Sequence, residues 1–284
     1  MPSSDRQRAK LEGETKRREN DRLARRGTKD SGVPGPAVRA ERKGPDVPGP
    51  RTVPELLAAA TAAGPSDPFL LWGEESWTTF AEFELAARRF AGALQSRGIT
   101  TGDRVAILMH NRPEFLTAAY GSMLTGALFV SINTALTASE ATYIAGHSGA
   151  RVLVSEPRHL ALVEKISACS EPELVVLAPP NDRQPAGGAI RWADFLADPL
   201  DPAARGEDLA VIQYTSGTTA SPKGVLLTQE SLVHAFRMRA RHLRYDATET
   251  MLVTGPLFHL NAQSVVTARH ARRDRQAQPV HDEG

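Results

Sequence analysis

One stretch of the chain combines the residue types that bind phosphate groups. From Ile212 to Val225 the sequence reads Ile-Gln-Tyr-Thr-Ser-Gly-Thr-Thr-Ala-Ser-Pro-Lys-Gly-Val. Glycine lets backbone amides approach an anion closely, and the hydroxyl groups of this stretch can hydrogen-bond its oxygens. Lys223 adds a mobile positive charge, and a charge-assisted hydrogen bond to phosphate contributes about 1.5–3 kcal/mol. The composition therefore indicates a phosphate-binding loop.

Apolar, β-prone residues stand on both sides of this loop, at 209–212 and 225–227, and they predict the order strand, loop, strand. A Walker P-loop needs Gly-Lys in that order and a helix directly after it. Here Lys223 precedes Gly224 and a strand-like run follows, so the P-loop interpretation fails. A surface turn that binds nothing is the simpler alternative for an isolated loop of this kind.

Twelve consecutive positions, Tyr214 to Val225, resemble the phosphate loop of the AMP-forming adenylating enzymes. These enzymes include acyl-CoA synthetases, luciferases and the adenylation domains of peptide synthetases. The resemblance implies that the loop holds the β and γ phosphates of ATP while a substrate carboxylate attacks the α phosphate, with Lys223 in a catalytic role. Ala220 stands where the family usually has glycine. The residues that the resemblance assigns to ATP are Thr215, Ser216, Gly217, Thr218, Thr219 and Lys223.

A second motif, Gly255-Pro-Leu-Phe-His-Leu-Asn-Ala-Gln263, resembles a substrate-site motif of the same family. The resemblance implies that Phe258 and His259 line the acyl pocket and the route of the pantetheine arm of CoA. A structural histidine beside a proline turn is the alternative for His259. The stretches 102–107, 111–115 and 124–127 are similar to acyl-CoA synthetases, particularly carnitine/crotonobetaine-CoA and fatty-acid-CoA ligases.

The resemblance covers about residues 52–268 and implies a ligase that adenylates a carboxylic acid with ATP and Mg²⁺ and transfers the acyl group to CoA. Segments that come later in complete members do not follow His259. We therefore expect a truncated form of such an enzyme. The alternative is an inactive fragment that acts as a nucleotide-binding or interaction module. The identity of the carboxylic acid and the oligomeric state stay open.

The elements that must position these motifs alternate between strand and helix. The residues Phe80, Phe83, Ala87, Phe90 and Leu94 recur at helical spacing, and Gly98 is expected to close that helix. Further expectations are a helix cap at Asn111, a capping box at Thr137 and Glu140, a helix from Thr228 to about Arg241, and a strand near 251–254. This alternation predicts an α/β fold with a largely parallel sheet flanked by helices. The resemblance implies that this sheet belongs to an incomplete N-terminal domain of the adenylate-forming fold. Such sheets bind ligands at the carboxyl ends of their strands, where the loop after Tyr214 lies.

Composition limits the remaining possibilities. The chain has 284 residues, 41% of them hydrophobic, and its net charge of +1 gives no overall field that would attract nucleic acid. Its single cysteine, Cys169, cannot form an internal disulfide, and no Cys/His spacing is typical of a metal site, so we expect a reducing cytoplasm. The uncharged stretch 115–139 is broken by glycines and asparagine, which predicts a buried helix-turn-strand and not a membrane span.

Three regions are expected. Residues 1–51 are predicted to be a disordered, basic, Pro/Gly-rich extension, because residues 1–50 hold 13 Lys and Arg against 8 Asp and Glu and no aromatic residue. Without aromatic side chains to stack on bases, a solvated extension is favoured over a nucleic-acid-binding arm. The resemblance implies that residues 52–268 are a truncated AMP-binding domain. Residues 269–284 are polar and basic without periodicity, which suggests a disordered tail read out of frame.

Overall fold

The computed structural model describes residues 49–73, 76–179, 188–206, 208–215, 221–244, 250–264 and 266–267. Two of the predicted regions lie outside these described residues: the extension, except for residues 49–51, and the tail at 269–284. The division of the chain into three regions therefore stays a prediction.

A seven-stranded sheet forms the centre of the described domain, in the order β7-β6-β5-β3-β4-β8-β9. Every neighbouring pair is parallel except β8 and β9, which are antiparallel. The predicted largely parallel sheet flanked by helices is confirmed. The strands are β3 Arg104–Leu108, β4 Leu128–Ser131, β5 Val152–Ser155, β6 Leu174–Leu177, β7 Ile190–Arg191, β8 Leu209–Thr215 and β9 Lys223–Thr228. A separate antiparallel pair consists of β1 Pro68–Trp72 and β2 Ser76–Thr79.

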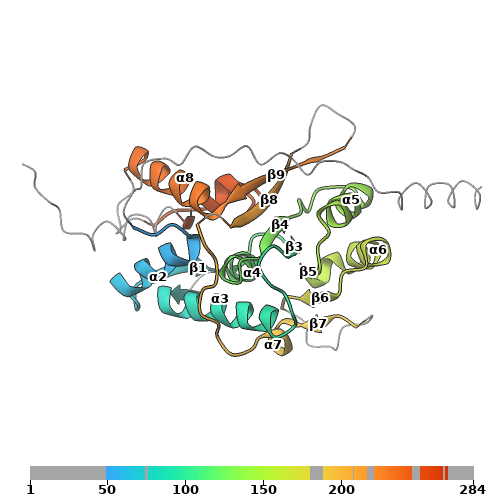
Figure 1. Ribbon diagram of the computed structural model, residues 1–284, viewed down its shortest axis with the longest axis horizontal. Coiled ribbons are helices and arrows are strands. Elements are labelled where there is room, and N and C mark those ends of the chain that lie inside the picture. The colour runs from blue at the N-terminus through green and yellow to red at the C-terminus, as the bar shows by residue number, and fades with distance from the viewer. Residues whose placement is uncertain are drawn as a thin grey trace, which may run out of the picture. The chain divides into compact units, whose positions relative to one another are not determined.

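Both faces of the sheet are buried, because successive side chains of a strand point to opposite faces. In β3, Val105 and Ile107 join one hydrophobic core, whereas Ala106 and Leu108 join another. Helices on opposite sides of the sheet cover the two faces, as Figure 1 shows. The first core packs against α2 Val53–Ala63, α3 Phe80–Gln95, α4 Pro113–Leu124, the short α7 Trp192–Phe195 and α8 Gln229–His242. The second packs against α5 Ala138–Ser148 and α6 Leu160–Ser170.

Helix α3 confirms the aromatic stripe read from the sequence, since all five of its predicted residues are buried in the first core. A capping box of Thr79 and Glu82 starts the helix. The helix ends at Gln95, and Gly98 lies in the turn that follows, with a φ of 76° that favours glycine. Helix α4 comes close to α3 at Gly121, where an added Cβ would lie 2.7 Å from Cδ1 of Phe90.

The uncharged stretch from Phe115 to Ser139 folds as the buried helix α4 followed by the buried strand β4. No helix among the described residues combines the length and the apolar character that crossing a membrane requires. The capping box at Thr137 and Glu140 and the cap of α8 by Thr228 are present as predicted.

Two local predictions are wrong. Met251–Thr254 does not form a strand: no strand among the described residues pairs with it, and Leu252 is 87% exposed. Apolar side chains of this segment line a cavity instead. Asn111 does not cap α4, because the N-cap position is Arg112, which makes no side-chain cap hydrogen bond. The Asn111 side chain binds a distant segment of the chain instead.

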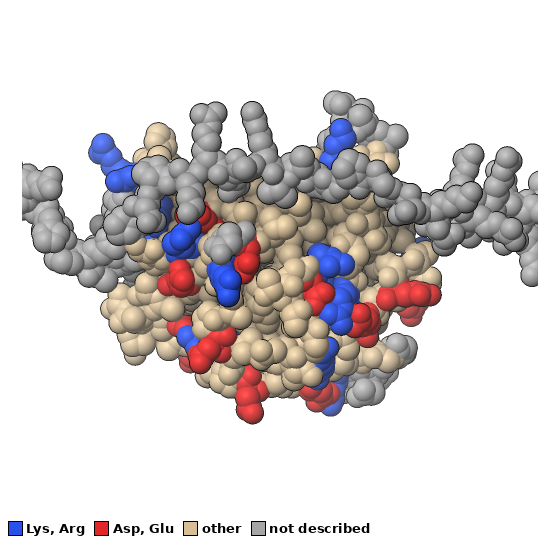
Figure 2. Space-filling view, viewed as in Figure 1, with Lys and Arg blue, Asp and Glu red and all other residues tan. Residues whose placement is uncertain are grey.

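The surface charges of the domain are largely mixed in sign. Figure 2 shows basic and acidic side chains interspersed on one face, with no large patch of a single sign among the residues described there. Among the described residues, Arg151 forms ion pairs with Asp103 and Glu173. This pattern agrees with the small net charge of the chain.

Candidate functional site

The predicted phosphate loop connects the ends of β8 and β9. Thr215 and Lys223 are directly opposite each other in the antiparallel register, so the loop leaves and re-enters the sheet at one point. That point is the carboxyl end of β8, which runs parallel to β4 and therefore ends at the edge of the sheet where α/β proteins bind ligands. Both residues are exposed. The other predicted ATP contacts, Ser216, Gly217, Thr218 and Thr219, lie outside the described residues.

Tyr214 anchors the start of the loop. Its hydroxyl lies 2.7 Å from Nδ1 of His147, whose ring stacks on Tyr143. Burial, with a smaller contribution from Tyr143, raises the pKa of Tyr214 to about 12, so the hydroxyl stays protonated at neutral pH. On the partner strand, a Cβ at Gly224 would lie 2.8 Å from Cγ2 of Ile212 and 3.3 Å from Cζ of Tyr214. The motif therefore needs glycine at 224 because the Tyr214 ring and Ile212 occupy that space.

The second motif is fastened to the carboxyl ends of three strands. Asn111, after β3, donates from Nδ2 to the Gly255 carbonyl at 2.9 Å, and its Oδ1 accepts from the Leu257 amide at 2.7 Å. The Phe258 carbonyl accepts from the Ser131 hydroxyl of β4 at 2.9 Å and from Nε2 of Gln213 in β8 at 3.4 Å. The structure thus brings both motifs to the same edge of the sheet.

The two residues expected to contact the acyl group differ in exposure. Phe258 is buried in the first core, whereas the His259 side chain is exposed, and the centroids of their rings lie 4.7 Å apart. An apolar cavity of about 450 Å³ lies beside this segment, between the β1–β2 pair and residues 250–253. Leu257 lines the cavity, but Phe258 and His259 do not. The proposed roles of these two residues rest on the motif alone.

Sequence reasoning missed Asn111, Ser131 and Gln213 as positioning residues. Each is a polar residue at or just beyond the carboxyl end of a parallel strand, which is the signal that could have identified them. Ser131 is the last residue of β4. Its hydroxyl donates to the Phe258 carbonyl, so this serine helps to position the second motif.

The fold and the site together define an α/β domain that presents a Ser/Thr/Gly loop at the ligand edge of a parallel sheet. The family described as AMP-binding enzyme matches residues 57–271, which is more than half of the chain. The chain therefore belongs to the AMP-binding enzyme family.

Particular relatives agree with this assignment. The chain is 35% identical over 198 residues to the long-chain-fatty-acid–CoA ligase FadD13 of Mycobacterium tuberculosis, covering 66% of this chain and 37% of that protein. It is 32% identical over 188 residues to a feruloyl-CoA synthase of an Amycolatopsis species, covering 66% of this chain and 36% of the relative. The crystal structure of the N-terminal domain of FACL13 from M. tuberculosis matches with a TM-score of 0.65 and 29% identity, covering 78% of this chain and 55% of the other. The chain thus spans little more than a third of the length of FadD13 and of the feruloyl-CoA synthase.

Proposed function

We propose that this chain is the N-terminal part of an ATP-dependent acyl-CoA ligase, an acid–thiol ligase. The reaction would couple a carboxylic acid to ATP, releasing pyrophosphate and forming an acyl adenylate, and the thiol of CoA would then displace AMP to give the thioester. The single observation that carries the proposal is the hairpin of β8 and β9, which sets Thr215 opposite Lys223 at the ligand edge of the sheet in a chain of the AMP-binding family.

The role proposed for Lys223 follows from its position. It is exposed at the first position of β9, and among the described residues no hydrogen bond or ion pair engages its ammonium group. A free ammonium group beside a loop of hydroxyls and amides can hold the departing pyrophosphate and stabilise the charge that develops on it. The proposed ATP contacts of Ser216, Gly217, Thr218 and Thr219 would complete this cradle.

Mg²⁺ enters the proposal as the counter-ion of ATP. Magnesium prefers oxygen ligands in octahedral geometry and commonly retains waters and substrate phosphates as ligands. Within the described part of the chain, the one group of three or more potential metal ligands contains two histidines and follows β3 and β5, not β8. No described residue is therefore assigned to magnesium. The proposed location of the protein is the cytoplasm. Cys169 is exposed and forms no disulfide bond.

The experiment measures equilibrium binding of ATP to the purified chain. We expect Lys223→Ala to weaken binding at least about 10-fold, since a charge-assisted hydrogen bond of roughly 1.5–3 kcal/mol is lost. Lys165→Ala is the matched control, because Lys165 is exposed on α6, which covers one face of the sheet. Unchanged affinity in the Lys223 variant, or absence of ATP binding by the wild-type chain, would refute the proposed site.

A second candidate is a nucleotide-binding or interaction module without ligase activity. It is favoured by the fact that the chain covers only 37% of the length of FadD13. Carboxylate-dependent exchange between ATP and pyrophosphate separates the two candidates. Exchange that disappears in Lys223→Ala supports adenylation by this chain, whereas ATP binding without exchange supports the module.

A further inference from the structure

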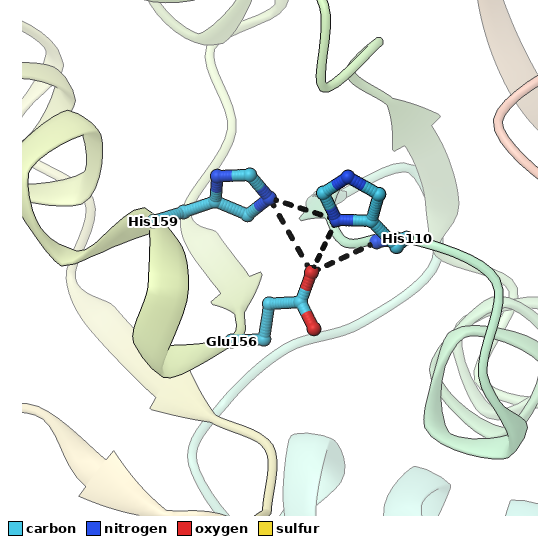
Figure 3. Close-up of side chains that lie close together, drawn as sticks. All are labelled: His110, Glu156 and His159. Carbon is cyan, nitrogen blue, oxygen red and sulfur yellow. Dashed lines mark hydrogen bonds and ion pairs between the residues drawn. The ribbon is translucent and has the colours of Figure 1, made fainter.

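Three potential metal ligands converge on one point beyond the ends of β3 and β5 (Figure 3). His110 follows β3, Glu156 follows β5, and His159 ends the short 3₁₀ helix η1 Pro157–His159. Nδ1 of His110 lies 2.6 Å from Oε1 of Glu156, and Nε2 of His159 lies 3.3 Å from the same oxygen. The two imidazole nitrogens lie 3.2 Å apart. Because β3 and β5 are parallel neighbours, their following residues meet at one edge of the sheet.

Glu156 is the fixed member of this cluster. Its side chain is only 6% exposed, and Arg112 binds Oε2 at 3.1 Å. Oε1 accepts the backbone N–H of His110 at 3.1 Å and faces both imidazole rings. The carboxylate is thus held in place by Arg112 and by a backbone N–H, as supporting groups hold the ligands of natural metal sites.

The three donor atoms already have separations that suit a metal ion. Tetrahedral zinc with bonds of about 2.0–2.2 Å to nitrogen and oxygen places its ligand atoms about 3.3–3.6 Å from one another. The distances of His159 Nε2 to Oε1 and to Nδ1 of His110 are 3.3 and 3.2 Å. Only the 2.6 Å contact of His110 with Glu156 has to lengthen. The His110 side chain is 46% exposed, so it has room to turn.

We propose that His110, Glu156 and His159 form a binding site for a divalent transition-metal ion of the zinc class. Two imidazoles and one carboxylate are ligands that Zn²⁺ and Co²⁺ accept, whereas Mg²⁺ and Ca²⁺ prefer oxygen ligands. The exposed side at His110 leaves a fourth position to water. The positive charge of Arg158 would repel the ion, since its Nε lies 3.7 Å from Oε1 of Glu156. The Arg158 side chain is 65% exposed, however, so it can move away into solvent.

This site is separate from the proposed ATP loop. In the strand order β5-β3-β4-β8, β3 lies two strands from β8, and neighbouring strands are about 4.7–4.9 Å apart. The strand that leads into His110 therefore lies roughly 10 Å from the strand that ends at Thr215. The ion would link the segments that follow β3 and β5. The first of these segments continues into Asn111, which holds the Gly255–Leu257 segment. The metal site and the proposed ligase function can therefore fail independently.

The test titrates Co²⁺ into the metal-free full chain and follows its visible absorption. We expect one Co²⁺ per chain, with the intense visible bands of a four-coordinate ion, displaced by Zn²⁺ and not by excess Mg²⁺. His159→Ala removes one ligand but keeps the Glu156 contacts with Arg112 and His110. It should weaken Co²⁺ binding by more than the roughly 10–100-fold that loss of a supporting group costs.

His242→Ala is the matched control, since His242 is exposed at the end of α8, away from the cluster. It should bind Co²⁺ like the wild-type chain. Circular dichroism of each variant verifies folding, and His110→Ala gives a second ligand deletion if one variant fails to fold. Co²⁺ binding that His159→Ala and His110→Ala leave unchanged, or no binding by the wild-type chain at millimolar metal, would overturn the proposal.

Discussion

Replacing Asn111 tests how the second motif is held in place. The Asn111 side chain makes two hydrogen bonds with backbone groups more than 140 residues away, to the Gly255 carbonyl and the Leu257 amide. Each hydrogen bond contributes about 0.5–1.5 kcal/mol net, and a buried group left without a partner costs about 1–3 kcal/mol. Leu257 is buried, whereas Gly255 is partly exposed and its carbonyl can be hydrated. We therefore expect Asn111→Ala to lower the free energy of unfolding by about 2–3 kcal/mol.

The space left by the truncated Asn111 side chain should add little to this loss of unfolding free energy. Asn111 already lines the cavity of about 450 Å³, so its truncation enlarges an existing space instead of creating a closed void. Urea unfolding followed by circular dichroism measures the change in stability, and amide hydrogen exchange at Leu257 measures the local loosening. Asn261→Ala is the control: Asn261 is exposed, and substitutions at such surface positions usually change stability by less than about 0.5 kcal/mol.

Asn111→Ser separates the observed role from the helix-cap interpretation of the sequence. Serine is as good an N-cap as asparagine, so a capping role predicts little change. Serine is too short to reach both Gly255 and Leu257, so the structure predicts nearly the same loss as for alanine. Stability of Asn111→Ser within about 0.5 kcal/mol of the wild-type value would refute the role of the Asn111 amide as the clamp on this segment.

Three further predictions concern the phosphate hairpin and the start of α5, and urea unfolding measures each of them. Gly224→Ala should cost about 1–3 kcal/mol, because its Cβ would lie 2.8 Å from Cγ2 of Ile212; an unchanged urea midpoint would contradict this. Thr137→Ala should cost about 1 kcal/mol of unfolding free energy through loss of the cap. Hydrogen bonds from Thr137 lower the pKa of Glu140 below 4.5, so this carboxylate stabilises the fold above pH 4.5 and the effect is lost as pH falls through the lowered pKa. Glu140→Gln should thus lower the free energy of unfolding at neutral pH, whereas in acid the variant and the wild-type protein should be equally stable. A difference in stability that does not change with pH would contradict this prediction.

Local sequence signals predicted the elements well where a single mechanism determines them. The capping box of Thr137 and Glu140 and the stripe of apolar residues along α3 act within one or two helical turns, so their geometry follows from spacing alone. The segment Met251–Thr254 shows the limit of this reasoning. Its residues favour strand, but a strand needs a partner, and apolar composition does not supply one. Its side chains line the cavity instead.

Sequence by itself determined the α/β alternation, the strand-loop-strand order around Thr215 and Lys223, and the membership of the family. These depend on short-range periodicity and on a contiguous motif. Tertiary structure alone decided which distant residues meet. The carboxyl ends of parallel strands converge at one edge, and only strand order places Asn111 beside Leu257, or His110 beside Glu156 and His159. Asn111 and Leu257 are 146 positions apart along the chain, and His110 and Glu156 are 46 apart, and no local pattern encodes such separations.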